Sequence, residues 1–224
     1  MRKPTQSRRV CLALATISFI SGLALPVRSS GKHVLPGSTS PRAAQAAVWR
    51  PINTNLPFSL DVRALAVDDA NADTIYAGVG GQVIRSIDGG ASWGQPSDSL
   101  DGYVVALAID PANRRILYAG TSWITGCNHT QRRVFKSTDG GATWKDINPG
   151  LNGCDRINAL VMSPADPRTI YVANFDGLGD SWTPLIKTLN GGESWIPLFN
   201  PPFAVLAIDP HNTDTLYGGT FDFV

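Results

Sequence analysis

The sequence predicts an all-β protein, a β-propeller of four-stranded antiparallel blades, because two phrases recur along the chain. The first phrase is an octapeptide that occurs three times, at residues 86–93, 137–144 and 188–195. Its third positions lie 51 residues apart both times, counted as 139 minus 88 and 190 minus 139. The second phrase is a pair of short alternating segments that occurs four times. Such regular spacing is typical of repeat architectures.

Each octapeptide is interpreted as a tight turn between two strands. An Asp followed by two glycines supplies the positive φ angles of a hairpin turn, and the carboxylate can accept hydrogen bonds from turn N–H groups and flanking hydroxyls. The Trp then opens the next strand as an apolar anchor. In the third copy Asn190 replaces the Asp and keeps a carbonyl acceptor, which predicts a weaker hairpin. The residues with this structural role are Ser86, Asp88, Gly90, Trp93, Ser137, Asp139, Gly141, Trp144, Thr188, Asn190, Gly192 and Trp195.

The second phrase predicts a β-hairpin at the start of each blade. Its apolar and polar residues alternate on both sides of a polar turn, which is the pattern of two paired strands. The copies occupy residues 64–78, 106–120, 159–173 and 205–219. The strand before each octapeptide and the strand that its Trp begins complete four strands per blade. The equivalent tyrosines at positions 76, 118, 171 and 217 are 42, 53 and 46 residues apart, which fits blades of about 40 to 50 residues.

Both ends of the repeat region depart from this scheme. Residues 49–56 resemble the outer strand at 144–151, but no octapeptide precedes them, so we expect an N-terminal strand that completes a blade elsewhere. Residues 220–224 approach a third strand, and the sequence stops before a fourth octapeptide. The repeat region at 47–224 therefore predicts three full blades and partial ones, either as a C-terminally truncated propeller or as a small ring of four.

The octapeptides resemble the Asp-box, or BNR repeat, and the repeat region as a whole resembles the WD40/YVTN/BNR-like propellers. Sialidases, sortilin-type receptors, xyloglucanase-type glycoside hydrolases and photosystem II assembly factors carry this repeat. The resemblance implies that the octapeptides are structural hairpins and that ligands bind on the opposite face. It does not select one activity, because one fold serves many functions. The sialidase Arg-Ile-Pro segment and the catalytic Tyr-Arg-Trp of xyloglucanases have no counterpart here.

The N-terminal segment predicts export. In residues 1–31, basic residues precede an uncharged apolar run, as in a signal peptide, and residues 32–46 have the composition of a flexible linker. General and twin-arginine secretion both fit the sequence around Arg8 and Arg9, and a retained N-terminal anchor is the alternative. We expect a secreted or periplasmic protein.

Composition restricts the partners. The chain carries 19 basic and 18 acidic residues, and removal of residues 1–31, with five basic residues, changes the balance to 14 minus 18, or −4. A mildly acidic chain without a basic cluster does not predict nucleic-acid binding. No cofactor or metal is expected, and no membrane contact beyond the export signal. Cys127 and Cys154 remain as an even pair, which predicts a disulfide, with two free thiols as the alternative.

Ligand binding is expected on the face where the second-to-third and blade-to-blade connections lie, which we call the long-loop face. The candidate ligand-binding residues in its two long connections are Trp123, Arg132, Asp176 and Trp182. Asp176 and Asp180 are weak candidates for the two carboxyl groups of a glycoside hydrolase. The other interpretation is that they are ordinary loop residues, so no catalytic residue is assigned.

Three functional hypotheses follow. The first is an exported non-enzymatic propeller that binds a protein or carbohydrate ligand on the long-loop face. The second is a fragment of a glycoside hydrolase, xyloglucanase-type or sialidase-like, without its catalytic blades. The third is a structural repeat array within a larger surface protein. The sequence leaves enzymatic activity open, with glycoside hydrolysis as the activity if there is one.

Overall fold

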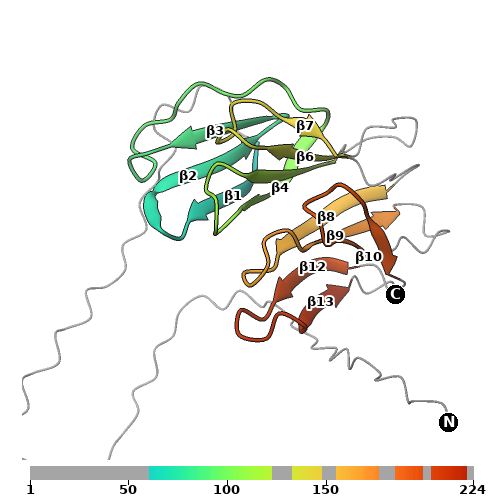
Figure 1. The fold of residues 1–224 in the computed structure, drawn as a ribbon. Helices are drawn as coiled ribbons and strands as arrows, with labels where there is room; N and C mark the ends of the chain where they lie inside the picture. The colour runs from blue at the N-terminus through green and yellow to red at the C-terminus, as the bar shows by residue number, and fades with distance from the viewer. Residues whose placement is uncertain (1–60, 123–132, 148–154, 177–184, 199–202, 221–224) are drawn as a thin grey trace, which may run out of the picture. The chain divides into compact units, whose positions relative to one another are not determined.

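The computed structural model confirms the predicted fold class. It describes residues 61–122, 133–147, 155–176, 185–198 and 203–220, and these form 13 strands in four antiparallel sheets (Figure 1). Residues 1–60 lie outside the described residues, so the export signal, the linker and the strand at 49–56 stay predictions. No helix in the described part of the chain is long and apolar enough to cross a membrane.

The second and third sheets each have the four strands of a complete blade. In both, the order in the sheet is the order in the sequence, as in an up-and-down meander. The second sheet contains β4 (Tyr103–Ile109), β5 (Leu117–Ser122), β6 (Val134–Ser137) and β7 (Lys145–Asp146). The third sheet contains β8 (Asp155–Met162), β9 (Ile170–Asp176), β10 (Leu185–Thr188) and β11 (Ile196–Leu198). Each octapeptide joins the third strand of its sheet to the fourth.

The first and fourth sheets have fewer strands. The first contains β1 (Val62–Asp68), β2 (Asn71–Val79) and β3 (Gln82–Ser86), and the fourth contains β12 (Phe203–Ile208) and β13 (Leu216–Thr220). The two strands of the fourth sheet match the half blade that the sequence predicts. The three strands of the first sheet differ from the four that the octapeptide at 86–93 predicts.

Pro96 explains why the first sheet has no regular fourth strand. The N–H of Gly94 donates to the Arg85 carbonyl at 2.8 Å, as an outer strand would. The next donor toward β3 would come from Pro96, which has no N–H, and Ser97 N donates to the Val83 carbonyl instead, at 2.9 Å. The Ser97 hydroxyl also accepts from Val83 N at 3.1 Å. The segment therefore follows β3 without forming a ladder.

An irregularity shared by all four sheets shows that the repeat extends beyond the recurring phrases. The register of each first hairpin shifts near the start of its first strand, at Val62/Ala64, Val104/Ala106, Ile157/Ala159 and Phe203/Val205. A bulge of this kind bends its strand and increases the local twist. Neighbouring sheets then pack through apolar clusters: one joins Tyr76 of β2 to Leu117 of β5, and another joins Tyr118 of β5 to Ile170 of β9.

Candidate functional site

The octapeptide turn at 137–144 is held together by two side chains. The Ser137 hydroxyl donates to Asp139 Oδ1 at 2.8 Å and accepts from Gly141 N at 2.9 Å. Asp139 in turn accepts from the backbone N–H of Thr143 at 2.9 Å and from its hydroxyl at 2.5 Å. Gly140 and Gly141 have φ angles of 80° and 88°, a conformation that side-chain-bearing residues rarely adopt. The turn at 86–93 has the same pattern around Asp88.

These hydrogen bonds favour the ionised carboxylates. Side-chain and backbone hydrogen bonds from Thr143, followed by the bond from Ser137, lower the pKa of Asp139 from 3.8 to about 2. The corresponding bonds from Ser92 and Ser86 lower the pKa of Asp88 to about 2. Both carboxylates therefore act as hydrogen-bond acceptors within their own turns.

The third octapeptide turn uses an uncharged version of this network. Asn190 Oδ1 accepts from the Thr188 hydroxyl at 2.8 Å and from Ser194 N at 3.0 Å. Its amide nitrogen donates to the Ser194 hydroxyl at 2.8 Å, whereas the Asp turns accept from the equivalent hydroxyl. The turn therefore keeps its geometry with one hydrogen bond reversed.

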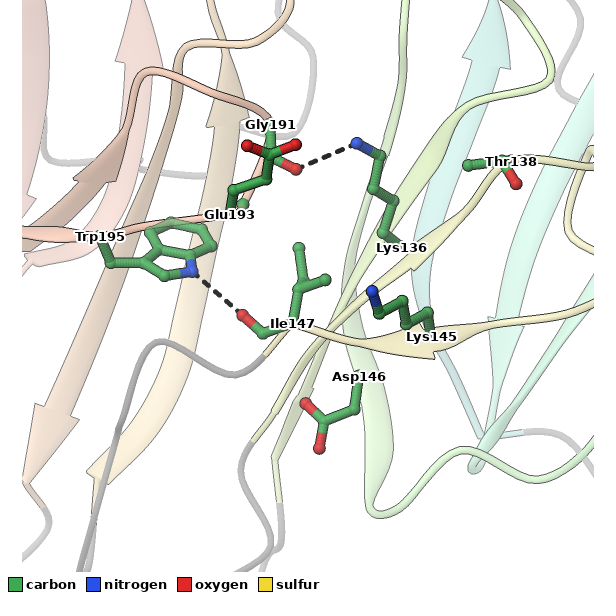
Figure 2. Close-up of a pocket in the computed structure, with 9 residues that line it drawn as sticks. Lys136, Thr138, Lys145, Asp146, Ile147, Gly191, Glu193 and Trp195 are labelled. Carbon is green, nitrogen blue, oxygen red and sulfur yellow. Dashed lines mark hydrogen bonds between the residues drawn. The ribbon is translucent and has the colours of Figure 1, made fainter.

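A groove of about 730 Å³ lies between the second sheet and the third octapeptide turn (Figure 2). Lys136, Lys145 and Asp146 line one side, and Glu193 and Trp195 line the other. Part of its lining holds the two sheets together: Lys136 Nζ donates to the Gly191 carbonyl at 3.1 Å, and the Trp195 indole N–H donates to the Ile147 carbonyl at 3.0 Å. The groove therefore lies where the two sheets contact each other, and the charged side chains of Lys136, Lys145, Asp146 and Glu193 line it.

Most candidates of the long-loop face fall outside the described residues. These are Trp123, Cys127, Arg132, Cys154, Asp180 and Trp182, so the disulfide and the ligand contacts stay predictions. Only the backbone of Asp176 is described; it ends β9 and pairs with Asp155 at the start of β8. That position lies at the end of the sheet opposite the octapeptide turn, as the topology predicts. No group of three or more His, Cys, Asp or Glu side chains in the described segments is arranged to hold a metal.

The described part of the long-loop face contains an ionic group that the sequence did not indicate. Arg133, which precedes β6, forms ion pairs with Asp101 at 3.6 Å and with Asp146. Asp101 lies before β4 and Asp146 ends β7, so one guanidinium links the segments before β4 and β6 to the end of β7. All three side chains are about one-third exposed. They can therefore still exchange hydrogen bonds with a polar ligand.

A second group lies between the first two sheets on the same face. Arg63 of β1 places its guanidinium 5.0 Å from the centre of the Tyr103 ring and forms an ion pair with Asp61 at 2.7 Å. Arg63 and Tyr103 stand at the beginnings of the first strands of their sheets. The long-loop face thus offers arginines, carboxylates and one aromatic ring near the described strand ends.

Comparison with known proteins agrees with the propeller fold. No family model matches the sequence. The chain is 26% identical to the xyloglucanase Xgh74A of Acetivibrio thermocellus, in a match covering 67% of this chain and 21% of that enzyme. It is 27% identical to a xyloglucanase of a Paenibacillus species, over 67% of this chain and 17% of that enzyme. A xyloglucanase of Hypocrea jecorina is 32% identical, over 46% of this chain and 12% of that enzyme.

Solved structures support the same fold. The GH74 xyloglucanase of Xanthomonas campestris matches 68% of this chain and 26% of its own chain, with a TM-score of 0.55 and 19% identity. An ancestral GH74 enzyme matches 66% of this chain and 20% of its own, with a TM-score of 0.54 and 21% identity. The chain therefore spans about a fifth of the length of the curated relatives that it matches over two thirds of its own.

Proposed function

We propose that this chain forms part of a polysaccharide-binding propeller of the xyloglucanase type, with the long-loop face as its carbohydrate side. The observation that carries the proposal is the sequence match to xyloglucanases from three organisms. These matches favour the glycoside-hydrolase hypothesis over the non-enzymatic binding module. Export through residues 1–31 belongs to the same proposal, because a polymeric polysaccharide is met outside the cell.

The chemistry of the long-loop face supports a hydroxyl-rich, uncharged ligand. The guanidinium of Arg133 can donate to sugar hydroxyls, and the carboxylates of Asp101 and Asp146 can accept from them. Aromatic rings offer apolar surface to the C–H face of a sugar, a role for Tyr103 and for the candidates Trp123 and Trp182. One guanidinium and two carboxylates give this group a net charge of −1, which does not favour an acidic polymer.

Hydrolysis needs two carboxyl groups, one of them protonated to act as general acid. Asp101 and Asp146 both form ion pairs with Arg133, so the described long-loop face presents them as acceptors for a sugar. The catalytic Tyr-Arg-Trp segment of xyloglucanases has no counterpart in the sequence. We expect this chain by itself to bind polysaccharide without cleaving it.

Affinity electrophoresis of the full chain in gels containing xyloglucan tests the proposal, with gels containing polygalacturonate for comparison. We expect xyloglucan alone to retard the chain. Arg133→Ala should reduce the retardation, whereas Arg115→Ala, an exposed arginine in a turn on the octapeptide side, should leave it unchanged. Migration unaffected by xyloglucan would disprove the proposal. Release of reducing sugars would instead indicate a catalytic carboxyl pair, with Asp176 and Asp180 as the first candidates, neither of whose side chains is described.

A further inference from the structure

Two octapeptide turns lie on a tyrosine of the preceding sheet. A Cβ atom placed on Gly141 would lie 3.4 Å from Cε1 of Tyr76, a residue of β2. In the next pair of sheets, the hydroxyl of Tyr118 in β5 donates to the carbonyl oxygen of Gly191 at 3.3 Å. The double glycine thus allows the turn to approach the tyrosine closely in both pairs of sheets, through Gly141 in one and through Gly191 in the other.

Each of these tyrosines is paired with a cation on the neighbouring strand. Tyr76 lies opposite Arg85, whose guanidinium is 5.6 Å from the ring centre. Tyr118 lies opposite Lys136, whose ammonium is 5.3 Å from the ring centre and also donates to the Gly191 carbonyl (Figure 2). The cation and the hydroxyl of the second pair therefore converge on one backbone oxygen. We call a tyrosine with its opposing cation a Tyr–cation pair.

A Tyr–cation pair fits a double-glycine turn for two physical reasons. The positive φ angles of the glycines turn a backbone carbonyl outward, where Lys136 and Tyr118 can both donate to it. The missing side chains leave room for the ring, since a Cβ on Gly191 would meet Tyr118 Oη and Lys136 Nζ, each at 3.1 Å. The pair therefore recognises a backbone shape that few sequences other than Gly-Gly can adopt.

The third sheet has a tyrosine and a lysine at the same register. Tyr171 of β9 lies opposite Lys187 of β10, as Tyr118 lies opposite Lys136. Both side chains of this third pair are half-buried. The sheet that follows consists of β12 and β13, and β13 pairs only with β12 among the described strands. Its Tyr217 is 42% exposed.

We propose that Tyr171 and Lys187 form a binding site for the double-glycine turn of a β-hairpin that pairs with β13 along the edge where no described strand lies. The hairpin would supply the third and fourth strands of the fourth sheet, and its turn would lie on Tyr171 as the turn at 188–195 lies on Tyr118. The occupant is defined by its chemistry: a hairpin of the octapeptide type, with a hydroxyl residue, an Asp or Asn, and two glycines. This inference does not depend on the proposed carbohydrate ligand.

The chain itself provides the probe, a fluorescein-labelled peptide with the sequence of residues 133–147. We expect saturable binding to the full chain in an anisotropy titration. Ordering a hairpin that is barely stable alone costs free energy, so a micromolar Kd is expected. A peptide with alanines in place of Gly140 and Gly141 should bind at least tenfold more weakly, and this comparison leaves the protein unchanged.

Protein variants locate the site. Tyr171→Ala and Lys187→Ala should each weaken peptide binding by about tenfold, a loss of roughly 1.4 kcal/mol. Arg85→Ala removes the cation of a pair whose turn is already in place, and should leave peptide binding unchanged. Equal binding of both peptides, or binding unaffected by the Tyr171 and Lys187 variants, would overturn the proposal. A dimer in sedimentation that the peptide does not dissociate would make a second copy the occupant and would overturn it as well.

Discussion

The hydroxyl of Tyr118 donates a hydrogen bond to the carbonyl oxygen of Gly191, 73 positions further along the chain. This bond joins the second sheet to the turn of the third, so its removal should weaken the boundary between two sheets. Tyr118→Phe should lower the free energy of unfolding by about 0.5 to 1.5 kcal/mol, because it deletes one buried hydrogen bond. Tyr118→Ala should lower it by about 3 to 5 kcal/mol through the lost ring volume.

Urea denaturation followed by circular dichroism measures both losses. Tyr217→Phe is the matched control, since the Tyr217 side chain is exposed. We expect the control to unfold at the wild-type midpoint. Equal midpoints for Tyr118→Phe and wild type would show that the 3.3 Å contact contributes no net stability.

The acid response of the octapeptide turns is a second prediction. The pKa of Asp139 is about 2 in the folded chain, below its ordinary value of 3.8, so the turn gains stability from the ionised form. This contribution is complete above about pH 3.8 and is lost as the pH falls toward 2. Asp139→Asn should unfold with a flatter dependence on pH in this window, because the amide does not titrate.

The turn at 188–195 is the natural precedent for that variant, since Asn190 already replaces the Asp there. Thermal unfolding at pH 2.5 and at pH 6 gives the comparison. Asp139→Asn should stay close to wild type at pH 6, and Asp139→Ala should lose a few degrees at both pH values because the Thr143 donors lose their acceptor. An unchanged pH dependence in the Asn variant would show that Asp139 is not responsible for the acid response.

Alanine substitutions at two glycines with positive φ distinguish the cost of backbone strain from the cost of steric overlap. Gly80 has a φ of 56°, and a Cβ built on it has no neighbour within 4 Å. Gly80→Ala should therefore lower the free energy of unfolding by about 1 to 2 kcal/mol, the cost of holding alanine in the left-handed conformation. Gly192 has a φ of 94°, and its built Cβ would overlap Cδ1 of Ile147. Gly192→Ala should therefore cost about 2 to 4 kcal/mol. Equal costs in urea denaturation would mean that the Ile147 side chain moves aside freely.

The predicted disulfide can be tested without structural information on its loops. Non-reducing peptide mapping of the protein should recover a cross-linked pair of peptides containing Cys127 and Cys154. The bond should disappear after reduction, and its loss should lower stability by roughly 3 kcal/mol. Complete alkylation of both thiols before reduction would contradict the prediction.

The sequence was sufficient to predict the sheets because their signals are local. The strand predicted directly before each octapeptide is present in each of the first three sheets, as β3, β6 and β10. The alternation of apolar residues and the turn-forming residues between strands depend only on near neighbours. The first sheet lacks a regular outer strand for a local reason too, because Pro96 has no N–H to donate to β3. The sequence nevertheless predicted a strand there, because Trp93 occupies the position of the Trp residues that directly precede β7 and β11.

The contacts between sheets were harder to predict from the sequence. The recurring tyrosines were visible, and so was a basic residue directly before each octapeptide, at positions 85, 136 and 187. Their contact requires the strand register, which pairs Tyr118 with Lys136 although the two residues lie 18 positions apart in the sequence. The Arg133 group had no sequence signal, because it links segments whose paths depend on the folded sheets.

The Tyr–cation pairs also predict which sheets unfold locally when one contact between sheets is lost. The turns at 137–144 and 188–195 are each held by the sheet immediately before them, so the stability of each sheet should depend on its nearest neighbours. Loss of one contact between a turn and the preceding sheet should raise the rate of amide hydrogen exchange in the two sheets that it joins. More distant sheets should stay protected from exchange. Damage at Tyr118 would then loosen β5 and β10 while β1 still exchanges slowly, so the chain would open sheet by sheet and not all at once.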